Sequence, residues 1–402
     1  MADRLLAMAS RIAIDPSQLP VTSDLAQRLR THVEILASPK LEGRKPGTPG
    51  HREAANYIVE QFQKLGLAPL PSLGGFGQPV TEKLGDNLIA MRPAASPQSA
   101  QAAQVPARWL LIGAHYDHLG GSYLGADDNA SAVAILLETA RALRPLPHHP
   151  ILFVAFNMEE QPYIRTSLMG SQHFVDHLPS EVGAPSNLHT VIIMDLMGGV
   201  HWAPLRNVVF AAGAEQSPGL YRRVKEASPV ADATAPLTIL PLGMHLVEQI
   251  PLVGQVSFSD YDAFRNESVP FLFLSAGRTP RYHEPSDLPD TLHYERMAAT
   301  VQWLASLIQR IDQDTDAYQF EANRLEFTDE VASLRPLVAH AATWETRIPG
   351  TSYLSYLRMK ADQTWMETLD TATPTPDAIK RLERLSIRMQ CLLTNFSGCF
   401  LI

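Results

Sequence analysis

The sequence predicts an α/β fold in which helices cover both faces of a mostly parallel sheet, followed by a helical C-terminal segment. Three observations support this. Short, almost wholly apolar runs alternate with segments whose apolar residues recur at helical spacing. Strands of such purely apolar character are typical of parallel sheets that are buried on both faces. From about residue 313 the strand-like runs stop, and only helical patterns remain.

The first predicted elements come before this alternation begins. Residues 1–24 are expected to form a loosely attached leader. Apolar positions at helical spacing then predict helices over residues 25–36 and 51–65. Residues 69–106 are rich in Pro, Gly, Ala and Gln, and only Asn87–Met91 within them is expected to be a strand.

The alternation itself defines one large domain, residues 25–312. Apolar runs predict buried strands at 109–114, 151–156, 191–194, 208–211 and 270–274. Helical spacing predicts helices at 133–140, 171–177, 220–227 and 293–311. Residues 313–402 are expected to form a separate helical appendage, in which Leu382, Leu385, Met389 and Leu392 share one helical face.

Composition narrows the class of protein. The 402 residues include 33 Lys and Arg against 42 Asp and Glu, a net charge of −9, which argues against non-specific nucleic-acid binding. Cys391 and Cys399 are the only cysteines, so a thiolate zinc site is not expected. No apolar run is long enough to span a bilayer, and Arg11 interrupts the apolar N-terminal stretch. We therefore expect a cytoplasmic protein.

Residues with metal-binding side chains follow several of the apolar runs. They are His115, Asp127, Glu160, Asp195 and His283. Because ligands of parallel α/β sheets bind outside the carboxyl ends of the strands, we expect these residues to meet at one edge. Two imidazoles and three carboxylates suit two zinc ions that share one bridging carboxylate.

Each residue of this set has an expected role. Asp117 is expected to orient the imidazole of His115, and Asp127 to bridge the two metals. Glu160 is expected to bind a metal, whereas Glu159 takes a proton from the bridging water. Taken singly, the motifs have simpler explanations: acidic residues are common at helix N-termini, and Glu159–Glu160 could be a solvated loop pair.

Taken together, the motifs resemble the co-catalytic dizinc aminopeptidase family. Its superfamily of zinc exopeptidases also includes glutamate carboxypeptidases, transferrin-receptor-like proteins and glutaminyl cyclases. The resemblance runs from about residue 25 to 311. The segments that carry it are Leu41–Arg44, Gly113–His118, Gly125–Ser131, Glu159–Glu160, Met169–Ser171 and His283–Asp287.

The resemblance implies a three-layer α/β/α zinc-exopeptidase (phosphorylase/hydrolase-like) domain with two Zn²⁺ per chain. It implies His115 and Asp195 on one zinc, Glu160 and His283 on the other, and Asp127 between them, followed by a cis peptide bond at Asp127–Asp128. The chain departs from the family in three ways. The loop after Glu160 is longer than usual, no protease-associated domain is inserted, and the C-terminal appendage has no counterpart.

The function that this resemblance implies is removal of N-terminal residues from peptides by a metallo-aminopeptidase, with a bridging hydroxide as nucleophile and Glu159 as general base. The expected partner is a peptide substrate, not nucleic acid or a membrane, and the C-terminal helices could mediate a homo-oligomer. Two alternatives stay open. One is a glutaminyl-cyclase-like acyltransferase with a single zinc, and the other is a non-catalytic interaction protein on the same fold.

Overall fold

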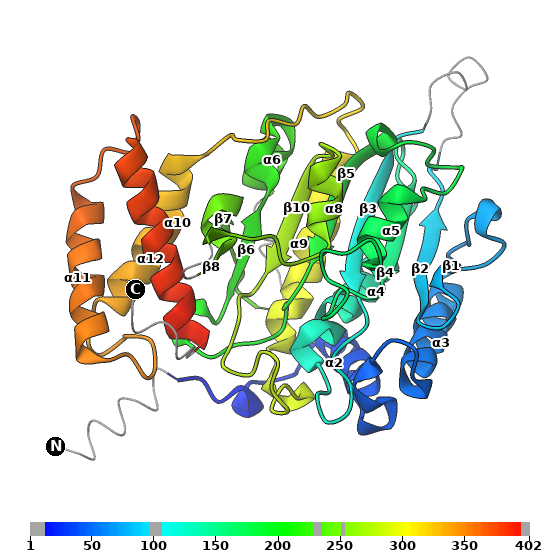
Figure 1. The fold of residues 1–402 in the computed structure, drawn as a ribbon, viewed down its shortest axis with the longest axis horizontal. Coiled ribbons are helices and arrows are strands. Elements are labelled where there is room, and N and C mark those ends of the chain that lie inside the picture. Colours follow the sequence, from blue (N-terminus) through cyan, green and yellow to red (C-terminus); the bar gives the residue numbers. More distant parts are fainter. Residues whose placement is uncertain (1–12, 96–106, 228–234, 251–253, 395–402) are drawn as a thin grey trace.

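The computed structural model describes residues 13–95, 107–227, 235–250 and 254–394. Within them, an eight-stranded mixed sheet forms the centre of the molecule, in the order β1-β2-β4-β3-β5-β10-β6-β7 (Figure 1). Its strands are β1 (Gly77–Thr81), β2 (Gly85–Arg92), β3 (Trp109–His115), β4 (Ile151–Phe156), β5 (Leu188–Met194), β6 (Val208–Ala212), β7 (Thr238–Leu242) and β10 (Phe271–Ser275). A separate two-stranded ribbon pairs β8 (Gln249–Ile250) with β9 (Gly254–Gln255).

The central strands of the sheet are parallel. β4, β3, β5 and β10 run in the same direction as neighbours, whereas β2 joins β4, and β6 joins β10, in antiparallel pairs. All of the strands expected from the apolar runs are present, which confirms the mostly parallel sheet. The sequence did not reveal the two edge strands, β1 and β7. They are half-exposed and contain Pro79 and Pro241, a residue that sheets tolerate chiefly at their edges.

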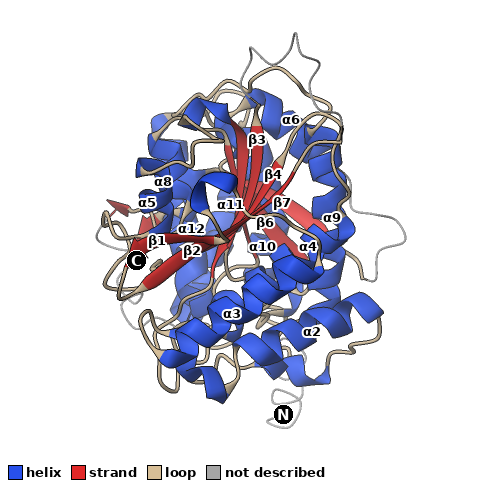
Figure 2. Ribbon diagram, turned by 90° about the vertical axis from the view of Figure 1, so that its right-hand side faces the viewer, coloured by secondary structure: helices blue, strands red, loops and turns tan. Residues whose placement is uncertain are grey.

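Helices cover both faces of the sheet, so the expected three-layer α/β/α architecture is confirmed (Figure 2). The helices of the main part are α2 (Asp24–Leu36), α3 (Pro49–Lys64), α4 (Ala132–Ala142), α5 (Gly170–Asp176), α6 (Pro218–Glu226), α7 (Met244–Val247), α8 (Tyr261–Asn266) and α9 (Tyr294–Ile311). One apolar core joins the sheet to α2, α3, α4, α6 and α9, and another joins it to α5 and α8. Along β3, Ile112 belongs to the first core and Leu111 to the second, as alternation along a strand requires.

The C-terminal segment is helical, as expected, and packs beside the β6–β7 end of the sheet (Figure 1). It consists of α10 (Phe327–Ala341), α11 (Tyr353–Glu367) and α12 (Pro376–Thr394). Leu334 and Leu382 of these helices share one apolar core with Trp202 and Leu242 of the main part. The domain boundary after residue 312 and an oligomer through these helices stay predictions. Among the described residues, no helix has the length and apolarity needed to cross a membrane.

Residues 13–23, which precede α2, form hydrogen bonds to the main part of the protein. Residues 1–12 of the predicted leader lie outside the described residues. The Ile14 N–H donates to the His201 carbonyl at 3.1 Å. The backbone N–H groups of Thr22 and Ser23 donate to the Glu295 carboxylate at 2.6 and 2.9 Å. Ser23 then caps α2 by accepting a hydrogen bond from the Ala26 N–H.

A buried carboxylate joins α2 to α4 and allows a test of the packing. Glu138 is 1% exposed, and its oxygens accept hydrogen bonds from Arg28 at 2.8 Å and Arg141 at 2.9 Å, with His32 at 3.2 Å. Burial raises the pKa of Glu138, but these hydrogen bonds dominate and lower it to about 2. The folded state therefore binds the ionised form more strongly than the unfolded state does.

We expect Glu138→Gln to lower the free energy of unfolding by about 2 kcal/mol at neutral pH, allowing for the solvent exposure of both arginines. Because the folded pKa is depressed, the difference from the wild type is complete above the usual pKa of 4.5 and is lost as the pH falls toward 2. Urea unfolding at several pH values measures it. Glu34→Gln, which removes an exposed pair with Arg30, is the control and should change stability by less than about 0.5 kcal/mol.

Candidate metal centre

Four of the five residues expected to bind metal lie together at the carboxyl edge of the parallel strands. His115 is the last residue of β3, Asp195 directly follows β5, and Glu159–Glu160 lie just beyond β4. His283 lies in the loop after β10. The backbone therefore places these side chains together because parallel strands end at the same edge, as predicted.

One group of possible metal ligands comprises His115, Asp128 and Asp195. The Nε2 atom of His115 lies 3.3 Å from Oδ1 of Asp128 and 3.6 Å from Oδ1 of Asp195. All three side chains are buried, and their ligand atoms lie within 4.8 Å of one another. Burial lowers the pKa of His115, but the carboxylates around it, Glu159 foremost, raise it well above the usual value. The group thus has the spacing and charge that favour a shared cation.

A second group contains His118, Asp128 and Glu160, with His283 beside it. Nδ1 of His118 lies 2.8 Å from Oε1 of Glu160, and the same three residues again bring ligand atoms within 4.8 Å. Nε2 of His283 lies 3.2 Å from Oδ2 of Asp128 and 3.2 Å from Oε2 of Glu160. The two oxygens of Asp128 therefore face different groups, Oδ1 the first and Oδ2 the second.

The structure places Asp128 between the two groups, where Asp127 was expected as the bridging residue. Oδ1 of Asp127 accepts hydrogen bonds from the backbone N–H groups of Gly198 at 2.7 Å and Gly199 at 2.8 Å. A Cβ atom at position 199 would lie 2.2 Å from Oδ2 of Asp127, so glycine is needed for this approach. Asp127 thus points toward the 198–199 loop, while Asp128 lies between the two groups. The cis peptide bond is likewise at Asp128–Asn129, not Asp127–Asp128.

His118 was missing from the expected site, although it ends the quoted Gly113–His118 motif. It is 1% exposed, and no hydrogen-bond partner for its Nε2 is found among the described residues. The signal that could have identified it is its place three residues after His115, close to the end of the strand. Asp287 was also missed. Its carboxylate accepts hydrogen bonds from the backbone N–H groups of Asp127 at 2.9 Å and Asp128 at 3.1 Å.

The donor set fits zinc. Nε2 of His115, Oδ1 of Asp195 and Nε2 of His283 are buried without a hydrogen-bond partner in the described structure. Buried polar atoms normally have partners, so these atoms are suited to a bound ion. Imidazole nitrogens and carboxylate oxygens are zinc ligands, and the buried carboxylates require a compensating positive charge.

Asp117 organises the backbone of the neighbouring glutamates, whereas its predicted role was to orient the imidazole of His115. Its Oδ1 accepts a hydrogen bond from the Glu159 N–H at 3.1 Å, and its Oδ2 accepts one from the Glu160 N–H at 3.2 Å. Its Oδ1 also lies 3.7 Å from Nδ1 of His115. Asp117 therefore holds β3 and the loop after β4 in one arrangement.

Glu159 has the environment of a proton acceptor. Its Oε2 lies 3.7 Å from Nε2 of His115, and its side chain is only 5% exposed. Burial raises the pKa of Glu159 well above its usual value, and the negative charges of Asp195 and Glu160 add to this effect. A carboxylate with a raised pKa holds a proton more readily, which suits a general base that later acts as an acid.

Arg44, from the motif Leu41–Arg44, connects two backbone segments next to the candidate site. Its fully buried guanidinium donates hydrogen bonds to the carbonyls of Tyr116 at 2.8 Å and Gly125 at 2.9 Å. Burial lowers the pKa of Arg44 to about 10, so the group stays charged at neutral pH. These bonds join the segment after β3 to the loop that carries Asp128.

The metal centre opens into a pocket of about 160 Å³. The residues that line it include Asp128, Glu159 and Glu160, together with Arg278 and Tyr282. A substrate in this pocket can therefore reach both the candidate metal ligands and the carboxylate of Glu159.

Comparison with known proteins gives a family match and two curated relatives. Residues 87–308 match the model of Peptidase family M28. The uncharacterised protein YfbL of Escherichia coli is 28% identical over 218 residues, 50% of this chain and 66% of YfbL. Aminopeptidase YwaD of Bacillus subtilis is 31% identical over 144 residues, 35% of this chain and 27% of YwaD.

The fold also resembles solved structures. BSAP, a zinc aminopeptidase from Bacillus subtilis, superimposes with a TM-score of 0.55 at 15% identity, covering 77% of this chain and 100% of BSAP. At this identity the likeness concerns the fold. The chain spans less than two thirds of the length of the curated relatives named above. The family match covers more than half of the chain and includes all the candidate ligands, and the chain therefore belongs to Peptidase family M28.

Proposed function

We propose that the protein is a zinc-dependent aminopeptidase with two zinc ions per chain. The observation that carries this proposal is Asp128, whose two carboxylate oxygens face two separate groups of buried ligand atoms. One zinc would be held by His115, Asp195 and Asp128. The other would be held by Glu160, His283 and Asp128, with His118 beside Glu160. The names of YwaD and BSAP support aminopeptidase activity.

Zinc, when bound, supplies Lewis acidity to a carbonyl oxygen and lowers the pKa of water. The residues supply the rest of the reaction. Oε2 of Glu159 accepts the proton of the attacking water and then delivers it to the amine that leaves when the peptide bond breaks. Asp117 fixes the backbone of Glu159, so this carboxylate stays directed at the substrate pocket.

Product analysis tests this proposal. The zinc-loaded protein should release residues one by one from the free N-terminus of a peptide and leave the N-acetylated form of the same peptide intact. Mass spectrometry of the products measures both reactions. Residues released from the C-terminus would make it a carboxypeptidase. Loss of ammonia from an N-terminal glutamine without hydrolysis would identify a cyclase, and no reaction at all would favour the interaction protein.

A further inference from the structure

His245 connects the main part of the protein to two of the C-terminal helices. It lies on α7, and its side chain is only 12% exposed. Nε2 of His245 lies 3.0 Å from Oε2 of Glu330 on α10, and Nδ1 lies 3.1 Å from Oε1 of Glu383 on α12. Each ring nitrogen therefore faces a carboxylate from a different C-terminal helix. We call these three residues the histidine clamp.

These two contacts require a charged imidazole. A neutral imidazole has one N–H donor and one acceptor nitrogen, whereas the imidazolium ion donates from both nitrogens. In the neutral form, one nitrogen would face a carboxylate that has no hydrogen to donate, so only the charged form satisfies both contacts. Burial lowers the pKa of His245, but the hydrogen bonds and charges of Glu330 and Glu383 outweigh it and raise the pKa above the usual 6.5. The geometry therefore corresponds to the protonated clamp.

The other charged groups around the histidine clamp do not provide a second cation. On the α10 side, the Glu326 N–H donates to Oε1 of Glu330 at 3.3 Å, and the Glu326 carboxylate pairs with Arg324. On the α12 side, the neutral Gln390 side chain donates to the Leu246 carbonyl at 3.0 Å. Within the described residues, neither carboxylate of the clamp forms an ion pair with any other side chain. Loss of the imidazolium charge would therefore leave both carboxylates without a positive partner.

A third carboxyl group, that of Glu215, contacts α7 as well. Its Oε1 accepts a hydrogen bond from the N–H of Met244, the residue before His245, at 2.9 Å. Burial raises the pKa of Glu215 to about 8, and the charge of Glu330 adds to this effect, so the group is largely neutral at pH 7. Its titration must therefore be distinguished from that of His245 in any experiment above pH 7.

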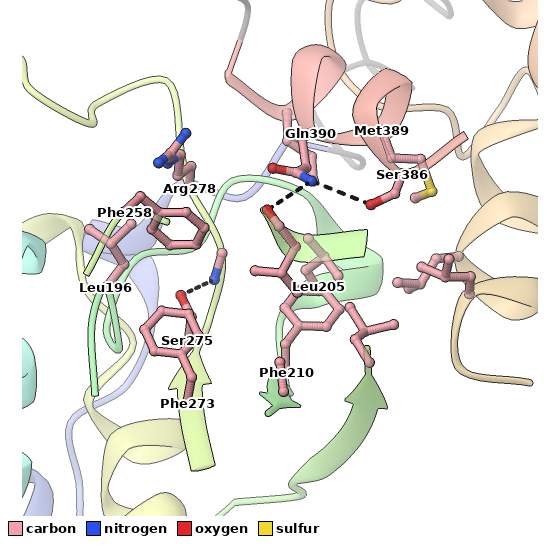
Figure 3. A pocket seen from close by; sticks show the side chains of 17 residues that line it. Leu196, Leu205, Phe210, Phe258, Phe273, Ser275, Arg278, Ser386, Met389 and Gln390 are labelled. Carbon is pink, nitrogen blue, oxygen red and sulfur yellow. Dashed lines mark hydrogen bonds between the residues drawn. The ribbon is translucent and has the colours of Figure 1, made fainter. Parts of the chain in front are cut away.

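The helices held by the clamp form one wall of a cavity beside the metal centre (Figure 3). Leu337 of α10 and Met389 of α12 line this cavity. Leu196, which directly follows the candidate ligand Asp195, lines both this cavity and the substrate pocket. The position of α10 and α12 therefore affects the space around the metal centre.

We propose that the histidine clamp is a pH-sensitive switch, which holds α10 and α12 closed against the main part when His245 is protonated. When His245 loses its proton, one contact is lost and the helices open more often by local unfolding. The apolar core shared by Leu334, Leu382 and Trp202 keeps the segment attached, so only the frequency of opening changes. The cavity wall beside the metal centre is therefore firm in acid and looser in alkali.

The raised pKa of His245 sets the direction of the pH effect. The stabilisation is complete below the usual 6.5 and is lost as the pH rises through the higher pKa of the folded state. In the zinc-loaded wild type, the hydrogen-exchange protection of α10 and α12, corrected for the intrinsic effect of pH, should therefore fall at least about threefold between pH 6 and pH 9. The protection of α4, which belongs to a different apolar core, should stay unchanged. Mass spectrometry of peptic fragments measures both.

Three variants identify the group responsible. His245→Gln should lower the protection of α10 and α12 at pH 6 to the level that the wild type shows at pH 9, and should remove the pH dependence. Glu383→Gln, which removes only the more exposed partner, should lower the protection at pH 6 by a smaller factor. Glu215→Gln is the matched control and should keep the wild-type pH dependence. Equal protection of the wild type at both pH values, or pH dependence that is lost in Glu215→Gln and retained in His245→Gln, would overturn the proposal.

Kinetic measurements extend the test to the metal centre and rest on the proposed peptidase function. The ratio of kcat/KM between His245→Gln and the wild type cancels the ionisations that both metal centres share. This ratio should lie at least about twofold below one at pH 6 and approach one at pH 9. A ratio that does not change with pH would overturn the link to the reaction. The exchange experiment needs no hydrolysis, so it decides on the clamp even if the protein cleaves no peptide.

Discussion

A Glu159→Gln variant is expected to fold and retain its zinc but to hydrolyse peptides about 10²–10⁴-fold more slowly than the wild type. Glutamine has nearly the same shape, and the backbone N–H at position 159 still donates to Asp117. The amide cannot accept the proton of the attacking water, so the loss should fall mainly on kcat. Steady-state kinetics and elemental analysis of the same preparation measure the two quantities.

Glu284→Gln is the matched control for this experiment. Glu284 is exposed and directly follows His283, so Glu284→Gln also removes one negative charge near the site. Its rates should stay within about twofold of the wild type, because exposed charges interact weakly. Retained hydrolysis in Glu159→Gln would exclude Glu159 as the base. Lost zinc in that variant would instead make it a ligand.

Replacing each of the two adjacent aspartates should have different consequences. Asp128→Asn removes one charge from both candidate zinc groups and should weaken zinc binding more than about 100-fold, since even changes beyond the direct ligands cost about 10–100-fold. Asp127→Asn should retain zinc, because the side-chain amide oxygen of asparagine can still accept hydrogen bonds from the N–H groups of Gly198 and Gly199. It should cost about 1–3 kcal/mol of stability through the weakened buried hydrogen bonds.

Zinc affinity is measured by competition with a chromophoric chelator, and stability by urea unfolding of the metal-free proteins. Each aspartate variant is the control for the other, because both remove one buried negative charge from the same turn. Strong loss of zinc from Asp127→Asn, with binding intact in Asp128→Asn, would reverse the assignment made from the structure.

The parts of the fold that the sequence predicted are those with a strong physical signal. The strands β3, β4, β5 and β10 are buried on both faces, so each appears as an apolar run. The edge strands β1 and β7 are half-exposed and interrupted by proline, so their pattern resembles that of a loop. The position of the C-terminal helices depends on long-range packing against β6 and β7, which has no periodicity along the chain.

The candidate site likewise contains residues that the sequence could predict and residues that it could not. His115, Glu160 and Asp195 could be predicted because each lies at or near a strand end. The choice between Asp127 and Asp128 could not be made in this way. Both lie in one turn, and their side-chain directions depend on local backbone dihedrals, such as those of Asp128 at φ −105° and ψ 93°. His118 was missed because its contact with Glu160 joins residues 42 positions apart.

Stepwise zinc titration of the metal-free protein, with release of N-terminal residues followed at each step, tests the two-zinc aminopeptidase most directly. The structure leads us to expect binding of two zinc ions per chain, with hydrolysis that depends on zinc and is absent from the metal-free protein. Saturation at one zinc, or full hydrolysis by the metal-free protein, would contradict the account.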